Sequence, residues 1–328
     1  MSSPPPAAPW RSLFLSHLAS MDSPEFTLGT LRRASSAGAR ARDRRSSILA
    51  TPAYFPRART CICRGLLTHL PVNPKNDAPL NPSGVWESDL LTFTTDARMD
   101  KMEELWEDGI DLSLRAGRGG DPGSPTTTKV GEELWEEGLA RMKGRAIEEV
   151  VAKSTAEKLK GSGGGAVVEA VFWARNHGAQ WRVRGRAYVL APDVETSPEG
   201  REVVTLLKSR MRRLISPGGG QESEWSFARE ITAHFGNLSP IMRGSFRNPP
   251  PGRPVALPVE GDGLALGQEV TDLEDPIARA NFRVVVIVPD ELDQADLSNP
   301  ERPRRWIHTY VGAHARGQSE WETVEVWP

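Results

Sequence analysis

The chain has 328 residues, enough for one large domain or two ordinary ones, and its hydrophobic fraction of 38% with ten tryptophans can form a real core. Its formal net charge is only -2. Proteins that bind nucleic acid or anionic membranes over a whole face carry a basic excess, so this balance argues against both partners and confines any basic site to a local pocket. No apolar run reaches the roughly 20 residues needed to span a bilayer.

The first third of the chain is predicted to contain a helix, two strands and a strand-to-helix turn. Apolar residues recur at helical spacing over 9–21, with a proline in the first turn, where its missing N–H does no harm. Short strands are expected over 25–31 and 54–70. Residues 88–109 begin as a β-like run and become helical from about Asp96, which predicts a strand, a turn and a helix.

Two features bear on the compartment. The only cysteines, Cys61 and Cys63, would share one face of a strand. A disulfide between such close neighbours is geometrically poor and zinc needs more ligands, so we expect buried, reduced side chains, a cytoplasmic location and no metal site. Residues 32–47 are rich in arginine and serine; we interpret them as a disordered loop, while a mitochondrial presequence is the alternative.

The middle of the chain is predicted to contain a long helix and a β-hairpin. The helix is expected over 131–160, and "GSGGG" at 161–165 reads as a flexible linker, because a dinucleotide-binding glycine motif would follow a strand and open a helix. The hairpin arms are 166–174 and 180–191, around the turn "RNHG". In the second arm alternate residues face one side, and the arginines among the others, Arg184 and Arg186, are interpreted as solvated surface charges.

A further helical stretch is predicted over 197–215, and the last strands over 281–289, 304–312 and 321–328. Short strands joined by hairpin turns favour a mainly antiparallel β-protein with helices, of the α+β class, and a barrel rather than a parallel doubly wound sheet.

Several arginines stand out against the weakly acidic balance. Arg59 and Arg64 flank an apolar strand, Arg98 and Lys101 lie at the strand-to-helix turn, and further arginines precede the strand at 304–312. Guanidinium groups bind phosphate bidentately, and each charge-assisted hydrogen bond contributes about 1.5–3 kcal/mol. The residues alone leave open whether Arg59 and Arg64 bind an anion or are solvated surface charges.

Four blocks in this order resemble the pyridoxamine 5'-phosphate oxidase-like FMN-binding split-barrel family, in particular its branch with an N-terminal "PWRSL" helix. They are "ARTCICRG" (58–65), "FTTDARMDK" (93–101), "VFWARNHGAQWRVRGRA" (171–187) and "ADLSNPERPRRW" (295–306). The resemblance implies a single FMN-binding split-barrel domain over 1–328, with insertions at about 32–53, 106–164 and 190–230. Proteins of this family usually form homodimers, with FMN between the subunits.

The resemblance also implies a set of flavin-binding residues. Arg59 and Arg64 would contact the phosphate and ring region, and Gln180 the edge of the isoalloxazine. Arg305 would reach the flavin from the partner subunit. Thr95 and Lys101 would bind the phosphate at the strand-to-helix turn, where helix-start N–H groups also favour an anion. Ser239 and Arg243 would line the site.

The chain departs from the family's pattern in places that matter. Asp100 stands where a second basic residue is common, which weakens phosphate binding. Where the true oxidase reads R-L-H before its late D-R, this chain has Glu301, Arg302 and Pro303, and a tryptophan expected before that motif is missing. Pyridoxamine-phosphate oxidase activity is therefore disfavoured.

One conflict is internal to the strand at 54–70. Arg59 and Arg64 are five residues apart, so an ideal strand points them to opposite faces, and a bulge or a position at the strand end must bring them together.

The sequence therefore predicts an FMN-binding protein and a flavin-dependent oxidoreductase with an unknown small-molecule substrate. No side chain is identified as a catalytic acid or base. Two alternatives remain open: a flavin-binding sensor or reservoir without turnover, and a structural or interaction protein that has lost FMN.

Overall fold

The computed structural model describes residues 6–33, 54–106, 159–214, 224–259, 261–312 and 320–328. The helix predicted over 131–160 and most of the predicted insertions at 32–53 and 106–164 lie outside these residues. Within the described ranges, ten strands are defined: β1 (Glu25–Arg33), β2 (Tyr54–Leu66), β3 (Trp86–Ser88), β4 (Leu91–Asp96), β5 (Gly163–Ala174), β6 (Ala179–Leu190), β7 (Met211–Arg213), β8 (Phe282–Asp296), β9 (Arg304–Tyr310) and β10 (Trp321–Val326).

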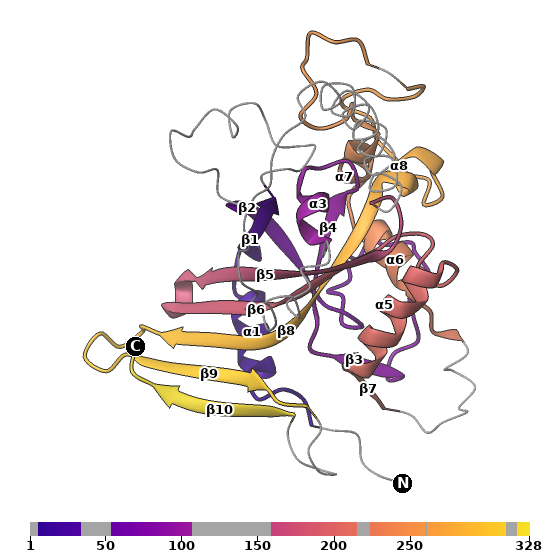
Figure 1. Cartoon of the computed structure of the whole chain (residues 1–328). Helices are drawn as coiled ribbons and strands as arrows, with labels where there is room; N and C mark the ends of the chain where they lie inside the picture. Colours follow the sequence, from indigo (N-terminus) through magenta and orange to yellow (C-terminus); the bar gives the residue numbers. More distant parts are fainter. Residues whose placement is uncertain (1–5, 34–53, 107–158, 215–223, 260, 313–319) are drawn as a thin grey trace, which may run out of the picture.

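The main sheet closes on itself. Its strand order is β10-β9-β8-β4-β2-β1-β5-β6, and an additional pairing of β8 with β6 joins β8, β4, β2, β1, β5 and β6 into a ring. Every pairing is antiparallel. Only β3 and β7 form a separate small sheet within the described residues. The predicted α+β barrel is thereby confirmed (Figure 1).

Strand β8 serves two parts of the barrel. Its first half pairs with β4 and its second half with β9, while β6 runs alongside both halves. The run 284–288 is buried on both faces of the strand. Val285 and Ile287 belong to the apolar core inside the barrel, whereas Val284 and Val286 pack toward the helices. A strand covered on both faces reads as a continuous apolar run, which is why this segment lacks the alternation seen in β6.

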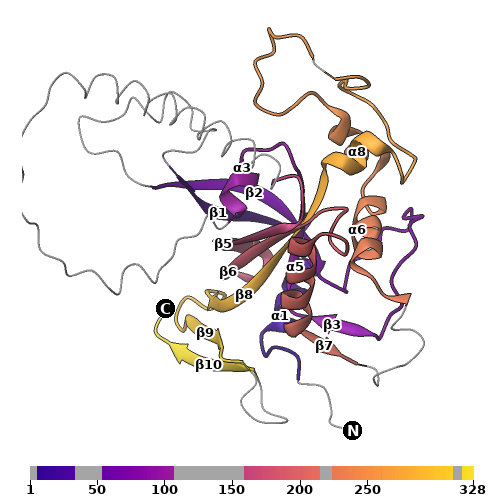
Figure 2. The same ribbon diagram turned by 45° about the vertical axis from the view of Figure 1, so that its right-hand side comes forward.

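The helices are α1 (Arg11–Ala19), α3 (Lys101–Leu105), α5 (Pro198–Ser209), α6 (Phe227–Gly236), α7 (Pro240–Gly244) and α8 (Pro276–Asn281), with short 3₁₀ turns η2 (Arg175–His177) and η4 (Ser245–Arg247). Helices α5, α6 and α8 lie together on one side of the barrel (Figures 1 and 2). Their apolar side chains form a second core with the outward-facing residues of β8. Helix α1 instead packs its apolar face into the core of the barrel.

Two local predictions are wrong. The helix predicted over 197–215 ends at Ser209 and is followed by β7, which pairs with β3. The glycines read as a flexible linker begin β5. Gly164 has a φ of +118°, and a Cβ there would lie 2.6 Å from the carbonyl oxygen of Ala187, so only glycine allows this close approach next to a β-bulge.

Helix α1 places a titratable group against the barrel. The ring of His17 accepts a hydrogen bond of 3.0 Å at Nδ1 from Trp181 Nε1 and stacks on His177, with 4.2 Å between ring centroids. Burial lowers the pKa of His17, and the neighbouring His177 lowers it further, against the opposing effect of Asp296. His17 is therefore neutral in the folded protein near pH 7.

This arrangement predicts a loss of stability in mild acid. The unfolded chain has a histidine pKa of about 6.5 and binds its proton first as the pH falls, so the stability contributed by neutral His17 is complete above about pH 6.5 and is lost below it. The free energy of unfolding, measured by urea denaturation, is expected to fall between about pH 8 and pH 5.5 less steeply in His17→Gln than in wild type. Equal slopes would contradict this role.

Candidate functional site

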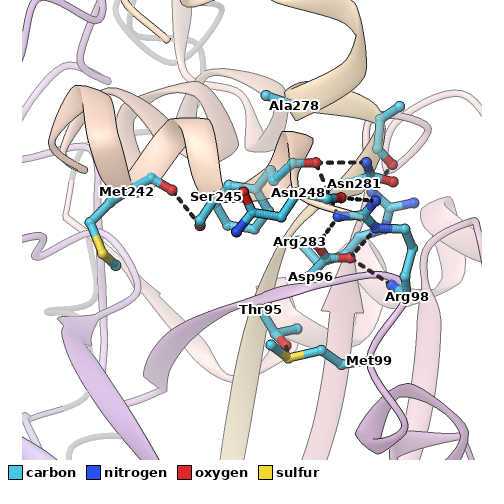
Figure 3. Close-up of polar contacts among 12 residues, drawn as sticks. Thr95, Asp96, Arg98, Met99, Met242, Ser245, Asn248, Ala278, Asn281 and Arg283 are labelled. Atoms are coloured by element: carbon cyan, nitrogen blue, oxygen red, sulfur yellow. Dashed lines mark hydrogen bonds and ion pairs between the residues drawn. The ribbon is translucent and has the colours of Figure 1, made fainter. Parts of the chain in front are cut away.

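The turn after β4 is attached to the segment that follows α7. Arg98 makes a bidentate ion pair with Asp96, with Nη2–Oδ2 at 2.6 Å and Nε–Oδ1 at 2.9 Å. The same guanidinium donates to the carbonyl oxygens of Phe246 and Asn248 at 3.1 and 2.8 Å, and Asn281 donates to the carbonyl of Phe246 (Figure 3). Arg98 is therefore used to hold the turn.

Lys101, at the start of α3, returns to the end of β4. Its Nζ donates to Thr95 Oγ1 at 2.9 Å and lies 2.9 Å from the sulfur of Met99. Figure 3 shows Met99 beside Thr95. Burial lowers the pKa of Lys101, and the positive charge of Arg59 lowers it further, although Cys61 and nearby carboxylates act in the opposite direction. Arg59 and Lys101 thus repel each other, and the carboxylates of Asp96 and Glu104 partly offset that repulsion.

Arg59 lies in the same region but is already paired. On β2 it stands opposite Leu28, and its guanidinium donates to Thr30 Oγ1, to Glu104 Oε2 and, at 3.5 Å, to the carbonyl of Leu28. Glu104, from α3, is buried and also accepts a hydrogen bond of 2.5 Å from Thr30. Helix α3 has only five residues, so its N–H groups add little of the helix-start field expected from the sequence.

The sequence did not identify Arg32 and Glu104 as part of this cluster. Arg32 Nε and Arg57 Nε each lie 3.8 Å from Glu104 Oε1, and Arg32 Nη2 lies 3.5 Å from Asp100 Oδ2. Arg32 was assigned to the arginine- and serine-rich loop, whereas β1 continues to Arg33. The sequence did contain an indication of this arrangement. Arg57 and Arg59 are two residues apart and so share one face of their strand, and extending the predicted first strand by two residues allows Arg32 to lie on the same face of the sheet.

Arg64 faces the opposite side of the sheet from Arg59. Arg64 Nε lies 3.4 Å from Thr94 Oγ1, whereas Lys101 reaches Thr95, and successive residues of a strand point to opposite faces. The irregularity in β2 lies between Cys63 and Leu66, an interval that includes Arg64, but Arg64 still contacts Thr94 and not Thr95. The conflict noted in the sequence is real, and within one chain the two arginines do not share a face.

Gln180 and Arg305 lie on β6 and β9, the two strands that flank the second half of β8. Gln180 of β6 stands opposite Ala295 of β8, which in turn stands opposite Arg305 of β9. Arg305 donates to Asp293 at 2.9 and 2.7 Å, and Arg182 also pairs with this carboxylate. Burial alone would raise the pKa of Asp293, but the two guanidinium groups lower it below its ordinary value. Arg305 therefore has a counter-ion within its own chain.

Ser239 and Arg243 stabilise α7. Ser239 is the N-cap, and its Oγ accepts a hydrogen bond from the backbone N–H of Met242 at 3.3 Å. Arg243 is buried, lies 3.5 Å from the carbonyl oxygen of Thr271 and stacks on the ring of Phe235. Within the described parts of the chain, no hydrogen bond or ion pair links either residue to Arg59 or Lys101.

The two cysteines lie on β2, and Cys61 is near the charges of Arg59 and Lys101. Cys61 and Cys63 are buried, unpaired and part of the barrel core, as predicted. Burial raises the pKa of Cys63 to about 11 and also raises that of Cys61, so both are protonated thiols near pH 7. Across the described ranges, no group of three or more ligand side chains is arranged to hold a metal ion. No described helix combines the length and apolarity that a membrane crossing requires.

Of the eight residues implied by the sequence motifs, the structure brings three together: Arg59, Thr95 and Lys101. Gln180 and Arg305 lie on the two strands that flank the second half of β8. Arg64 lies on the other face of β2. Ser239 caps α7 and Arg243 lies within that helix.

A family comparison connects the first group to a known domain. The family described as pyridoxamine 5'-phosphate oxidase, FMN-binding domain, matches residues 7–116, which confirms the resemblance seen in the sequence motifs. No curated protein matches the sequence.

A comparison with two solved structures covers nearly the whole chain. The first is a pyridoxamine 5'-phosphate oxidase-related, FMN binding protein from Nostoc punctiforme PCC 73102, at 15% identity and a TM-score of 0.50, covering 98% of this chain and 100% of the other. At this identity the likeness shows a shared fold. The second is PhzG from Burkholderia lata 383 in complex with tetrahydrophenazine-1-carboxylic acid, at 12% identity and a TM-score of 0.40, covering 99% and 94%. That TM-score supports no conclusion.

Proposed function

We propose that this chain, whose residues 7–116 match the FMN-binding domain of the pyridoxamine 5'-phosphate oxidase family, binds FMN with its phosphate at Arg59, Thr95 and Lys101. One observation carries the proposal. The matched segment contains β1, β2, β4 and α3, the elements that place these three side chains together.

The side chains present suit a phosphate. A guanidinium group, an ammonium group and a hydroxyl are the donors that phosphate oxygens accept, and charged hydrogen bonds contribute about 1.5–3 kcal/mol each. Micromolar affinity requires about 8 kcal/mol, which a few such contacts and a buried ring can supply.

The finer proposal is a flavin-dependent oxidoreductase that acts as a homodimer. Bound FMN supplies hydride transfer, while the protein binds and orients the cofactor and excludes water. In this arrangement Gln180 contacts the edge of the ring and Arg305 reaches the flavin of the partner subunit. The substrate is an amine or another small reductant; because Glu301, Arg302 and Pro303 replace the family's substrate-binding motif, we do not propose pyridoxamine phosphate.

Replacing Arg59 with alanine tests the cofactor assignment. The dissociation constant for FMN, measured by quenching of flavin fluorescence, is expected to rise about 10- to 100-fold, because one charge-assisted contact is lost. Riboflavin, which lacks the phosphate, is expected to bind wild type and variant alike. Arg184→Ala, which removes an exposed arginine on the barrel exterior, is the matched control and leaves FMN binding unchanged. Unchanged FMN affinity in Arg59→Ala would refute the assignment.

A second candidate, a relative that no longer holds FMN, is favoured by one contact: Glu104 already occupies the guanidinium of Arg59. The visible absorbance spectrum of the purified protein separates the possibilities. Flavin bands that are bleached by an amine and restored by oxygen support the oxidoreductase. Flavin bands without turnover support a sensor or reservoir, and a colourless protein that takes up no added FMN supports loss of the cofactor.

A further inference from the structure

We propose that Arg32, Arg57 and Arg59 form a binding site for a phosphomonoester group, and that Glu104 is the internal counter-ion of this site when no phosphate is bound. The inference deepens the proposed function, on which its identification with the FMN phosphate rests. It adds two arginines and a competing carboxylate to the site.

Arg32 is the observation that points to a missing ligand. Its side chain is 1% exposed, yet none of its three guanidinium nitrogens has a hydrogen-bond partner in the part of the chain that the structure describes. The nearest carboxylate oxygens, on Asp100 and Glu104, are 3.5 and 3.8 Å away from it. A buried guanidinium without hydrogen bonds is costly, and native structures leave such groups rarely. An acceptor placed among these nitrogens would remove that cost.

The strand register explains why the cations share one space. Thr30 on β1 stands opposite Arg57 on β2, and Leu28 stands opposite Arg59. Residues two apart on a strand lie on the same face, so Thr30, Arg32, Arg57 and Arg59 all face α3. Contacts from each of them to Glu104 confirm this placement.

Glu104 satisfies the cluster only in part. Its Oε2 accepts hydrogen bonds from Arg59 and Thr30. Its Oε1 is buried, has no hydrogen-bond donor among the described residues, and lies 3.8 Å from both Arg32 Nε and Arg57 Nε. The Glu104 carboxylate thus lies within ion-pair distance of all three guanidinium groups, but of these only Arg59 donates a hydrogen bond to it. A tetrahedral phosphate dianion offers three terminal oxygens and a larger charge, which suits three planar guanidinium groups better. Phosphate binding then frees Arg59 from Glu104, since two anions in one buried cluster repel each other.

The test uses the full-length protein and inorganic phosphate at about pH 8. This pH is above the second pKa of inorganic phosphate, about 7, so most of it carries the double charge of a phosphomonoester. The midpoint of thermal unfolding is followed as phosphate replaces chloride at equal ionic strength, and the apparent affinity comes from its concentration dependence. Wild type is expected to be stabilised by phosphate. Arg32→Met, which keeps the buried volume and removes the charge, is expected to weaken phosphate at least about 10-fold.

The counter-ion is tested by Glu104→Gln. This variant is expected to bind phosphate more tightly than wild type, because the competing negative charge is gone. Glu87→Gln is the matched control: Glu87 also pairs with two arginines, Arg11 and Arg212, in a separate cluster. It is expected to leave phosphate affinity unchanged. Should Arg32→Met fail to fold, Arg57→Met gives the same test at a side chain that is 40% exposed.

The outcomes separate this inference from the proposed function. If FMN binds wild type, but Arg32→Met and Glu104→Gln alter neither phosphate nor FMN affinity, the inference is overturned and the FMN proposal stands. If phosphate stabilises the protein through Arg32, while neither FMN nor riboflavin binds, the phosphate site is supported and the FMN proposal is overturned. A wild type that phosphate does not stabilise overturns the inference.

Discussion

Replacing Asp89 with alanine is expected to lower the free energy of unfolding by about 3–5 kcal/mol, the cost of leaving buried charges without their partner. Asp89 is buried in the short connection between β3 and β4. Arg212 of β7 donates to both of its carboxylate oxygens, and Arg11 of α1 lies 3.6 Å away. The backbone N–H of Ala8 donates to it at 3.1 Å.

The large expected effect comes from what the substitution leaves behind. Alanine would remove the main counter-ion of two buried guanidinium groups, with Glu87 as the remaining carboxylate in contact with both. It would also release the N-terminal segment before α1 from the β3–β4 connection. Urea denaturation monitored by tryptophan fluorescence measures the change.

Glu291→Ala is the control for the Asp89 variant. It removes a carboxylate whose partner, Arg184, is more than half exposed, and exposed pairs contribute at most about 1 kcal/mol. A loss in Asp89→Ala no greater than in this control would show that the buried cluster does not hold α1 and the small sheet to the barrel.

Replacing Phe14 with alanine in the wild-type chain is expected to lower the free energy of unfolding by about 3–5 kcal/mol, the range for removing a buried aromatic ring. Phe14 is fully buried on the inner face of α1. Its ring meets Trp10, Phe172 and Trp181 edge to face, with centroid separations of 5.8, 5.2 and 5.3 Å. These contacts join α1 to the β5–β6 hairpin, so their loss leaves a cavity where helix and barrel meet.

Leu13, one residue earlier on the same helix, provides the matched control. Its side chain is 44% exposed, so Leu13→Ala introduces the same alanine into the helix without opening a cavity. It is expected to change the unfolding free energy by less than about 1 kcal/mol. Equal losses from both substitutions would contradict the packing of α1 into the barrel.

The alternation of side chains along the sequence was sufficient to predict which residues share a face in several strands. Alternation in the second hairpin arm correctly separated its two faces, with Trp181 and Val183 buried on one and Arg184 exposed on the other. Arg186, interpreted as a solvated charge, is instead half-buried and donates to the carbonyl oxygen of Gly165 at 2.7 Å. The C-x-C spacing correctly placed both cysteines in the core. These predictions succeed because a strand's side-chain alternation is a property of the backbone alone. The glycines at 163–165 were misread because distant residues require them: the carbonyl oxygen of Ala187 crowds Gly164 and the side chain of Trp106 crowds Gly163, which no local pattern reveals.

By itself, the sequence determined the class of fold, through apolar periods, and the resemblance of its first third to a known FMN-binding domain, through ordered motifs that depend on neighbouring residues. Only the tertiary structure decided which charges meet. Glu104 reaches Arg32 and Arg59 from the far side of the strand-to-helix turn, and Arg64 is directed away from them by strand alternation. Ion pairs between residues tens of positions apart depend on strand register and barrel closure, which arise only when the whole chain packs.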